Sequence, residues 1–203
     1  MIIKGLSIDS IWKNKEENFR KIETLLENQS ADLFVLPEMF TTGFCMEPHE
    51  IADRNNETLV WLQNLANQHQ TAICGSVSVE EKGLFYNRFY FVEKNKNTHF
   101  YNKKHLFTYS GEEKVYSKGN SKTIVNIDGF RILLQVCYDL RFPVYSRYQN
   151  DYDAILYVAN WPEARISAWE TLLKARAIEN QCYVFGVNRT GTDGNGLHYP
   201  ESS

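Results

Sequence analysis

The chain has 203 residues, of which 43% are hydrophobic and 14% aromatic, enough apolar material for one substantial core. Its 22 Lys and Arg are balanced by 25 Asp and Glu, the formal net charge is -3, and neither sign forms a long block. This balance argues against a nucleic acid as partner.

The sequence suggests neither a membrane protein nor a secreted protein. The first residues, MIIKGLSIDSIWKNKEENF, lack the basic start and continuous apolar stretch of a signal peptide, and no later segment approaches the ~18 apolar residues of a membrane span. The four cysteines are widely separated and form no C-x-x-C pair, which argues against a zinc knuckle or a disulfide framework. We therefore expect a cytoplasmic protein with reduced thiols and no contact with a membrane.

The first half of the chain is predicted to alternate strands and helices. Short apolar runs predict strands, and apolar residues three and four apart predict helices. In chain order these are a strand at 2–8, a helix around Phe19, Ile22, Leu25 and Leu26, a strand at 31–37, a helix at 57–68 and a strand at 71–79. Antiparallel pairing follows, because the turn-forming residues 94–97 separate two strand candidates at 86–93 and 98–101.

The second half contains the strongest short hairpin signal, Asp128-Gly129, between strand candidates at 123–127 and 130–136. A strand at 153–159, a helix at 164–180 and a strand at 182–188 complete the pattern. Polar residues follow several of these strands, namely Glu38, Lys103, Cys137 and the pair Asn160-Trp161. Because open α/β sheets place their sites at strand ends, these residues are candidates for one site.

Cys137 stands where an apolar strand gives way to a charged turn that ends at Pro143. A nucleophilic thiol needs a base, donors for the developing oxyanion and an acid for the leaving amine. On spacing alone, a small core residue is the commoner role for such a cysteine. Cys74 and Cys182 lie inside apolar runs and fit that core role better.

The other candidates are ambiguous by themselves. Glu38 follows an apolar run, and desolvation there would raise its pKa and suit it to proton transfer, although a solvated turn residue is the ordinary interpretation. Lys103 and Lys104 resemble a solvated edge, and His105 beside Leu-Phe is more typical of a structural histidine than of a general base.

Four motifs together resolve this ambiguity. The segments Leu-Pro-Glu-Met-Phe (36–40), Tyr-Asn-Lys-Lys-His-Leu-Phe (101–107), Val-Cys-Tyr-Asp-Leu-Arg-Phe-Pro (136–143) and Tyr-Val-Ala-Asn-Trp-Pro (157–162) resemble, in order and separation, the nitrilase superfamily of carbon-nitrogen hydrolases. Residues 175–181 and 186–196 look like the branch that contains bacterial omega-amidases. The resemblance runs from the first strand to about Tyr199.

The resemblance implies a mixed α/β fold, a four-layer α-β-β-α sandwich. It implies a catalytic triad of Glu38, Lys103 and Cys137, with Lys103 chosen over Lys104 because the family lysine stands two places before the histidine. A second family glutamate best matches Glu112, with Glu113 as the alternative. No metal or cofactor is implied.

The implied reaction is hydrolysis of the terminal amide of a small 2-oxo acid, such as 2-oxoglutaramate, through a thioester on Cys137. A substrate carboxylate would suit a bidentate cation, and Arg141 or Arg165 can supply it. Alternatively, Arg141 braces the Cys137 turn by pairing with Asp139. The expected pocket walls, by their position in the motifs, are Tyr138, Asn160 and Trp161.

Family relatives continue with further strands and a C-terminal arm, so we expect residues 1–203 to be a single domain that lacks these parts. An unpaired sheet edge would follow. Alternative functions are another carbon-nitrogen hydrolase (nitrilase, carbamoylase or aliphatic amidase) or an inactive, truncated homologue that acts as an oligomeric or binding component. The resemblance also implies a homodimer or a larger homo-oligomer.

Overall fold

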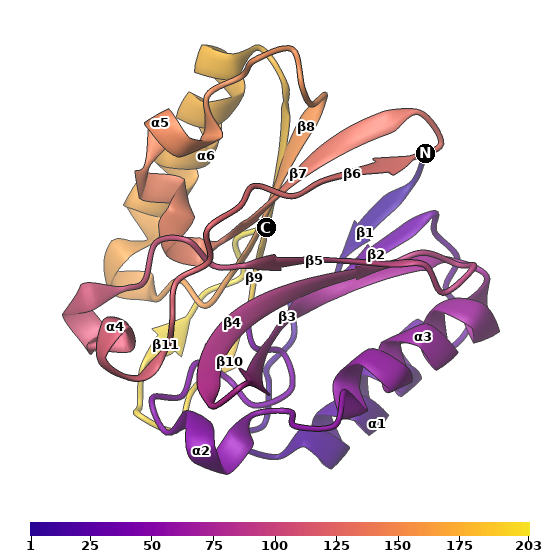
Figure 1. Cartoon of the computed structure of the whole chain (residues 1–203), viewed down its shortest axis with the longest axis vertical. Coiled ribbons are helices and arrows are strands. Elements are labelled where there is room, and N and C mark those ends of the chain that lie inside the picture. The colour runs from indigo at the N-terminus through magenta and orange to yellow at the C-terminus, as the bar shows by residue number, and fades with distance from the viewer.

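The computed structural model describes residues 1–203, and most of its strands belong to two sheets (Figure 1). The strands are β1 (Ile3–Gly5), β2 (Leu33–Val35), β3 (Ala72–Glu81), β4 (Leu84–Val92), β5 (Thr98–Asn102), β6 (Ile124–Ile127), β7 (Phe130–Val136), β8 (Ala154–Ala159), β9 (Tyr183–Asn188), β10 (Gly191–Thr192) and β11 (His198–Tyr199). The helices are α1 (Lys15–Leu26), α2 (Pro48–Ile51), α3 (Glu57–His69), α4 (Glu112–Val115), α5 (Pro143–Ser146) and α6 (Ile166–Asn180). Short 3₁₀ turns cover Thr108–Ser110, Cys137–Arg141 and Glu163–Arg165.

The two sheets combine parallel and antiparallel pairing. In the first, ordered β1-β2-β3-β4-β5, the strands β1 to β3 are parallel and β4 is antiparallel to β3 and β5. In the second, ordered β6-β7-β8-β9, the strands β7 to β9 are parallel and β6 is antiparallel to β7. The small pair of β10 and β11 stands apart from both sheets.

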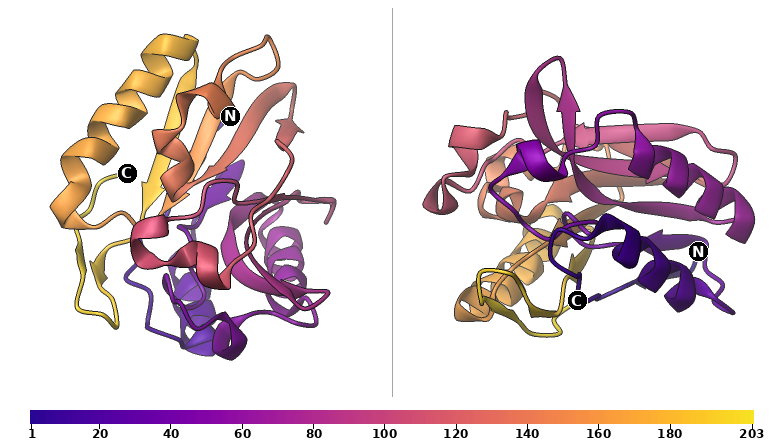
Figure 2. Two further views of the ribbon diagram at one scale, coloured as in Figure 1. Left: turned by 60° about the vertical axis from the view of Figure 1, so that its left-hand side comes forward. Right: turned by 90° about the horizontal axis from the view of Figure 1, so that it is seen from below.

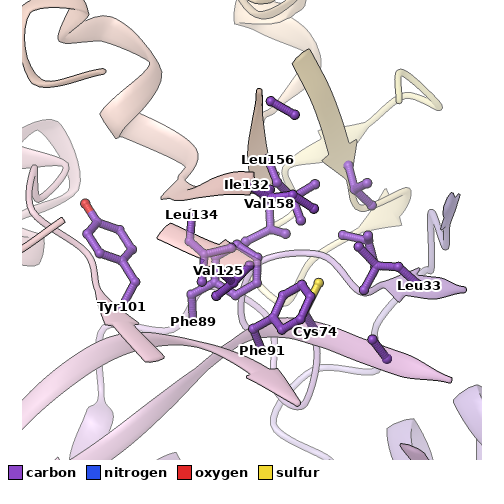
Figure 3. Close-up of a cluster of buried hydrophobic side chains, with 14 of the residues drawn as sticks. Leu33, Cys74, Phe89, Phe91, Tyr101, Val125, Ile132, Leu134, Leu156 and Val158 are labelled. Atoms are coloured by element: carbon purple, nitrogen blue, oxygen red, sulfur yellow. The ribbon is translucent and has the colours of Figure 1, made fainter. Parts of the chain in front are cut away.

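Alternating side chains place the sheets face to face. In β2, Leu33 and Val35 point into the core between the sheets, whereas Phe34 points to the opposite side and packs in the core beneath the helices. Figure 3 shows this central core, where Phe89 and Phe91 of β4 lie against Leu134 of β7 and its neighbours. Two further cores lie outside the sheets, so the expected four-layer α-β-β-α sandwich is confirmed.

The outer layers are helices with one buried stripe. Helices α1 and α3 cover the outer face of the first sheet and bury Ile22, Leu26 and Leu62 there. Helix α6 lies along the second sheet (Figure 2), and its Trp169 side chain is fully buried. The close approach of α6 depends on Gly186, because a Cβ there would stand 2.6 Å from a methyl carbon of Leu173. None of the helices combines the length and the apolar character that a membrane crossing requires.

The expected elements are all present, with differences at their boundaries. β1 and β2 are only three residues long, whereas β3 extends to Glu81 and forms a long hairpin with β4 that we did not predict. Lys82 and Gly83 make its turn with positive φ angles of 53° and 77°, as a tight hairpin requires. The charged residues at the end of β3 do not follow a strand pattern in the sequence. In the structure, Glu81 forms an ion pair with Arg88 across the hairpin. On the second sheet, β9 pairs only with β8, so its other edge carries no strand.

Candidate active site

The residues expected to form a site emerge from strand ends that the two sheets bring together. Cys137 directly follows β7 and Asn160 directly follows β8. Because Val136 pairs with Val158 in the parallel ladder, the segments that follow β7 and β8 leave the sheet side by side. The Cys137 Sγ therefore lies 3.9 Å from the carbonyl oxygen of Asn160. Glu38 and Lys103 approach from the first sheet, after β2 and β5.

Lys103 is a buried ammonium enclosed by two carboxylates. Its Nζ donates to Glu38 Oε1 at 2.9 Å and to both oxygens of Glu112, at 3.1 and 2.9 Å. The side chains of all three residues are fully buried. Burial by itself would lower the pKa of Lys103, but the carboxylates of Glu112 and Glu38 raise it well above its usual value. The ammonium therefore keeps its charge inside the protein.

The two oxygens of the Glu38 carboxylate have different partners. Oε1 accepts from Lys103 Nζ and, at 2.8 Å, from Asn87 Nδ2. Oε2 accepts only the backbone N–H of Asn160, at 2.9 Å. A carboxylate oxygen has two lone-pair sites, so Oε1 is saturated and Oε2 retains one free position. The Asn160 side chain also donates to the Glu38 carbonyl oxygen, at 2.6 Å, which fixes the backbone of this turn.

Cys137 is half-buried, at the first position of the turn Cys137–Arg141, with a positive φ of 45°. Such a backbone is uncommon for a residue with a side chain and is typical of functional sites held by their surroundings. Burial and the Glu38 carboxylate raise the pKa of the Cys137 thiol well above its usual value, although Lys103 opposes this. The thiol is therefore protonated at neutral pH and needs a base before it can attack.

A cavity of about 110 Å³ opens above this cluster. Seven of the expected residues line it, namely Lys103, Cys137, Tyr138, Arg141, Asn160, Trp161 and Arg165. Glu38 and Glu112 do not line the cavity but lie behind Lys103. Such a space accommodates a small molecule with a few polar groups.

Comparisons with known proteins agree with this geometry. A model of the carbon-nitrogen hydrolase family matches residues 5–203. The chain belongs to the carbon-nitrogen hydrolase family. It is 48% identical to the omega-amidase YafV of Escherichia coli, over 93% of this chain and 74% of that protein, and 36% identical to the 2-oxoglutaramate amidase of Bacillus subtilis, over 94% and 77%.

A solved structure of similar fold is XC1258 from Xanthomonas campestris, described as a CN-hydrolase superfamily protein with an arsenic adduct in its active site. Its TM-score with this chain is 0.94 at 40% identity, and the match covers 97% of this chain and 78% of that one. The fold and the enzyme class of the chain are therefore those of a carbon-nitrogen hydrolase.

The structure separates the alternatives that the motifs left open in this carbon-nitrogen hydrolase. Glu112 contacts Lys103, whereas Glu113 is exposed. Arg141 does not pair with Asp139, which instead binds His105. The guanidinium of Arg141 lies 5.2 Å from the centre of the Trp161 ring, and that of Arg165 lies 5.1 Å from the centre of the Phe107 ring. Neither arginine forms an ion pair.

Several residues of the site were not predicted. Asn87 is fully buried and also points toward Glu112, with 3.4 Å between Nδ2 and Oε1. It shares a face of β4 with Phe89 and Phe91, so a polar residue on an apolar face was the signal that could have revealed it. The other unpredicted lining residues are Phe44, Met46, Phe107, Ser110, Pro162, Asp193, Asn195, Leu197 and Tyr199.

Proposed function

We propose that the chain is an omega-amidase, which hydrolyses the terminal amide of a small 2-oxo acid such as 2-oxoglutaramate to the dicarboxylate and ammonia. The observation that carries the proposal is the buried cluster of Glu38, Lys103 and Glu112 beside Cys137, below a cavity with two unpaired arginines. The similarity to the omega-amidase YafV and the 2-oxoglutaramate amidase supports the substrate class.

In the first half of the proposed reaction, the free position of Glu38 Oε2 takes the proton of Cys137, and the sulfur attacks the amide carbon. The carbonyl π electrons move to oxygen, where the Lys103 ammonium and the Tyr138 backbone N–H hold the developing charge. Tyr138 is suited to this because the first N–H groups of a helical turn have no partner within it. Collapse breaks the C–N bond, Glu38 returns the proton to the leaving nitrogen, and ammonia departs.

The second half repeats these steps with water. Glu38 takes a proton from the water molecule as its oxygen attacks the thioester carbon, and the same two donors hold the oxyanion. Collapse breaks the C–S bond, and the proton on Glu38 returns to the sulfur. Lys103 remains charged throughout, because its two carboxylate neighbours raise its pKa.

The substrate carboxylate is proposed to bind at the cavity wall formed by Arg141 and Arg165. A guanidinium offers paired N–H donors that match a carboxylate, and this matters most where the cation has no acidic partner of its own. Both side chains line the cavity that contains Cys137. Tyr138, Asn160 and Trp161 form the walls between these arginines and the thiol.

The deciding experiment measures ammonia released from 2-oxoglutaramate by the wild type, Cys137→Ala and Cys137→Ser. Both variants should lose almost all turnover, because alanine has no nucleophile and a serine alkoxide is far harder to form than a thiolate. Cys182→Ala is the matched control, since Cys182 is also half-buried but does not line the cavity, and it should retain wild-type turnover.

The same assay separates the alternatives. Turnover that survives in Cys137→Ala contradicts the thioester route. Absence of turnover in the wild type with any amide would favour an inactive homologue. Turnover of nitriles, carbamoyl compounds or neutral aliphatic amides in preference to 2-oxoglutaramate would favour another branch of the family.

We also propose that residues 1–203 act as one domain that assembles as a homodimer through the face formed by α5 and the C-terminal half of α6. Val144 and Ile178 are 72% and 77% exposed there, with Tyr148 and Tyr183 nearby. The backbone N–H of Tyr148, which follows α5, donates to Asn180 Oδ1 at the end of α6, so these two elements lie side by side. Large exposed apolar groups that lie together favour association.

A further inference from the structure

Asp139 is a buried carboxylate beside the site that the proposed reaction does not use. It is completely buried and does not line the cavity. Its Oδ2 accepts from Tyr101 OH at 2.9 Å and from the N–H of Val136 at 3.0 Å. Its Oδ1 accepts from the N–H of His105 at 2.9 Å and lies 2.7 Å from His105 Nδ1. These four contacts fill the acceptor positions of the carboxylate.

The four donors come from two segments that carry reacting groups. Tyr101 and His105 stand two residues before and two residues after Lys103, while Val136 directly precedes Cys137. Tyr101 OH also accepts the N–H of Lys104, at 3.0 Å, so the carboxylate holds both sides of the Lys103 segment. One side chain thus joins the segment with the ammonium to the turn with the thiol.

The turn itself needs such support. Cys137 has a positive φ of 45°, which costs free energy for a residue with a Cβ and persists only where surrounding contacts hold it. The His105 ring stacks on Phe142 at the end of the same turn, with 3.8 Å between centroids and 6° between planes. His105 therefore contacts the turn at two points, through hydrogen bonds to Asp139 and through stacking on Phe142.

We propose that Asp139 is a positioning residue, which sets the Cys137 sulfur against the Lys103 ammonium and the Glu38 carboxylate by binding Val136, Tyr101 and His105 at once. The proposal rests on the proposed function only through the role of Cys137 as nucleophile. It also assigns His105 and Tyr101 to the support of the site rather than to proton transfer.

The test compares Asp139→Asn with Asp53→Asn. Asn has nearly the shape of Asp, but its NH₂ group cannot accept a hydrogen bond. Turned one way, the amide loses the two contacts with His105, and turned the other way it loses the bonds from Tyr101 and Val136. Asp53 is the matched control, because it is also buried and accepts the N–H of Thr58, at 2.8 Å, and the Lys15 ammonium, away from the cavity. Urea unfolding measures how much stability each variant loses.

The readout is the rate at which iodoacetamide alkylates each cysteine, resolved by peptide mass spectrometry. In Asp139→Asn the Cys137 rate should fall by roughly tenfold to a hundredfold, as expected for a misplaced reacting group. The Cys182 rate, an internal reference for loosening of the fold, should not change. In Asp53→Asn neither rate should fall.

A second variant covers the case in which Asp139→Asn does not fold. Tyr101→Phe removes a single donor to Asp139 and should slow alkylation of Cys137 to a smaller extent, again with Cys182 unchanged. Wild-type Cys137 rates in the folded variants, or faster alkylation of both cysteines, would overturn the proposal. Because alkylation displaces iodide and requires no amide hydrolysis, it stays decisive even if the wild type hydrolyses none of the amides offered, an outcome that would contradict only the proposed function.

Discussion

Arg141 and Arg165 are held by aromatic rings rather than by acids. The guanidinium carbon of Arg141 lies 5.2 Å from the centre of the Trp161 ring, and that of Arg165 lies 5.1 Å from the centre of the Phe107 ring. A cation held over an aromatic ring needs no acidic partner, so its N–H groups are not taken up by an ion pair. Elsewhere in the chain, Arg131 and Arg176 pair with Asp153 and Glu179. The free arginines are therefore available to an anionic substrate.

At the residue scale, we predict that Arg141→Gln or Arg165→Gln lowers kcat/KM for 2-oxoglutaramate by roughly 10- to 150-fold, because a charge-assisted hydrogen bond is worth about 1.5–3 kcal/mol. The same variant should hydrolyse a neutral aliphatic amide at an unchanged rate. Arg→Lys at the same position is the control that keeps the charge and loses the bidentate contact, so its loss should be intermediate. Equal losses with charged and neutral amides would show that the arginine acts on the fold of the pocket instead.

At the scale of elements, β7 and β8 are fastened at the ends opposite the site. Asp153, just before β8, accepts from the N–H of Arg131 in β7 at 2.9 Å and from its Nη2 at 2.7 Å. Hydrogen bonds from the side chain and then the backbone of Arg131 lower the pKa of Asp153 to about 2. The pair fixes the register from which Cys137 and Asn160 emerge at the other end.

We predict that Asp153→Asn destabilises the protein only where the carboxylate is ionised. Because the folded pKa is depressed, the stabilisation is complete above the unfolded pKa of about 3.9 and is lost as pH falls toward 2. The difference in free energy of unfolding between wild type and variant, from urea titrations, should therefore be constant above about pH 5 and shrink between pH 4 and 2. Its size is modest because the pair is partly exposed.

Asp128→Asn provides the control, since it makes the same chemical change in the exposed turn between β6 and β7. Its effect on stability should not vary with pH in this way. A difference for Asp153→Asn that stays constant down to pH 2 would mean that the ion pair does not stabilise the folded protein.

At the scale of the whole molecule, both sheets contribute to one central core, and the site is formed where they meet. Glu38 and Lys103 follow strands of the first sheet, whereas Cys137 and Asn160 follow strands of the second. Separation of the sheets would therefore break the site and expose the core together. This arrangement supports the proposal that residues 1–203 are one domain.

The proposed dimer gives a prediction at the same scale. Ile178→Glu should shift the protein from dimer to monomer in sedimentation velocity runs, because a carboxylate would have to be buried in the apolar contact. Val60→Glu is the control, since Val60 is 50% exposed on α3, on the outer face of the other sheet. If the wild type sediments as a monomer, or Ile178→Glu remains a dimer, this face is not the interface.

Much of the architecture was predictable from local pattern. The apolar runs of β2 and β7, the hairpin at Asp128-Gly129 and the apolar stripes of α1 and α3 all follow from local sequence pattern. The β3–β4 hairpin was missed because its turn lies within a charged stretch, where cross-strand pairing between Glu81 and Arg88 outweighs local polarity.

The sequence by itself determined which chemical groups are available, a thiol, a buried acid and a lysine at the ends of predicted strands, through motifs that resemble one family. Only the tertiary structure decided which atoms they meet. Most partners of Glu38 and Asp139 lie dozens of residues away, Asn87 among them, and the cavity wall draws on residues 193–199. Hydrogen-bond direction and side-chain burial depend on how two sheets pack, and neither is encoded in the spacing along a single strand.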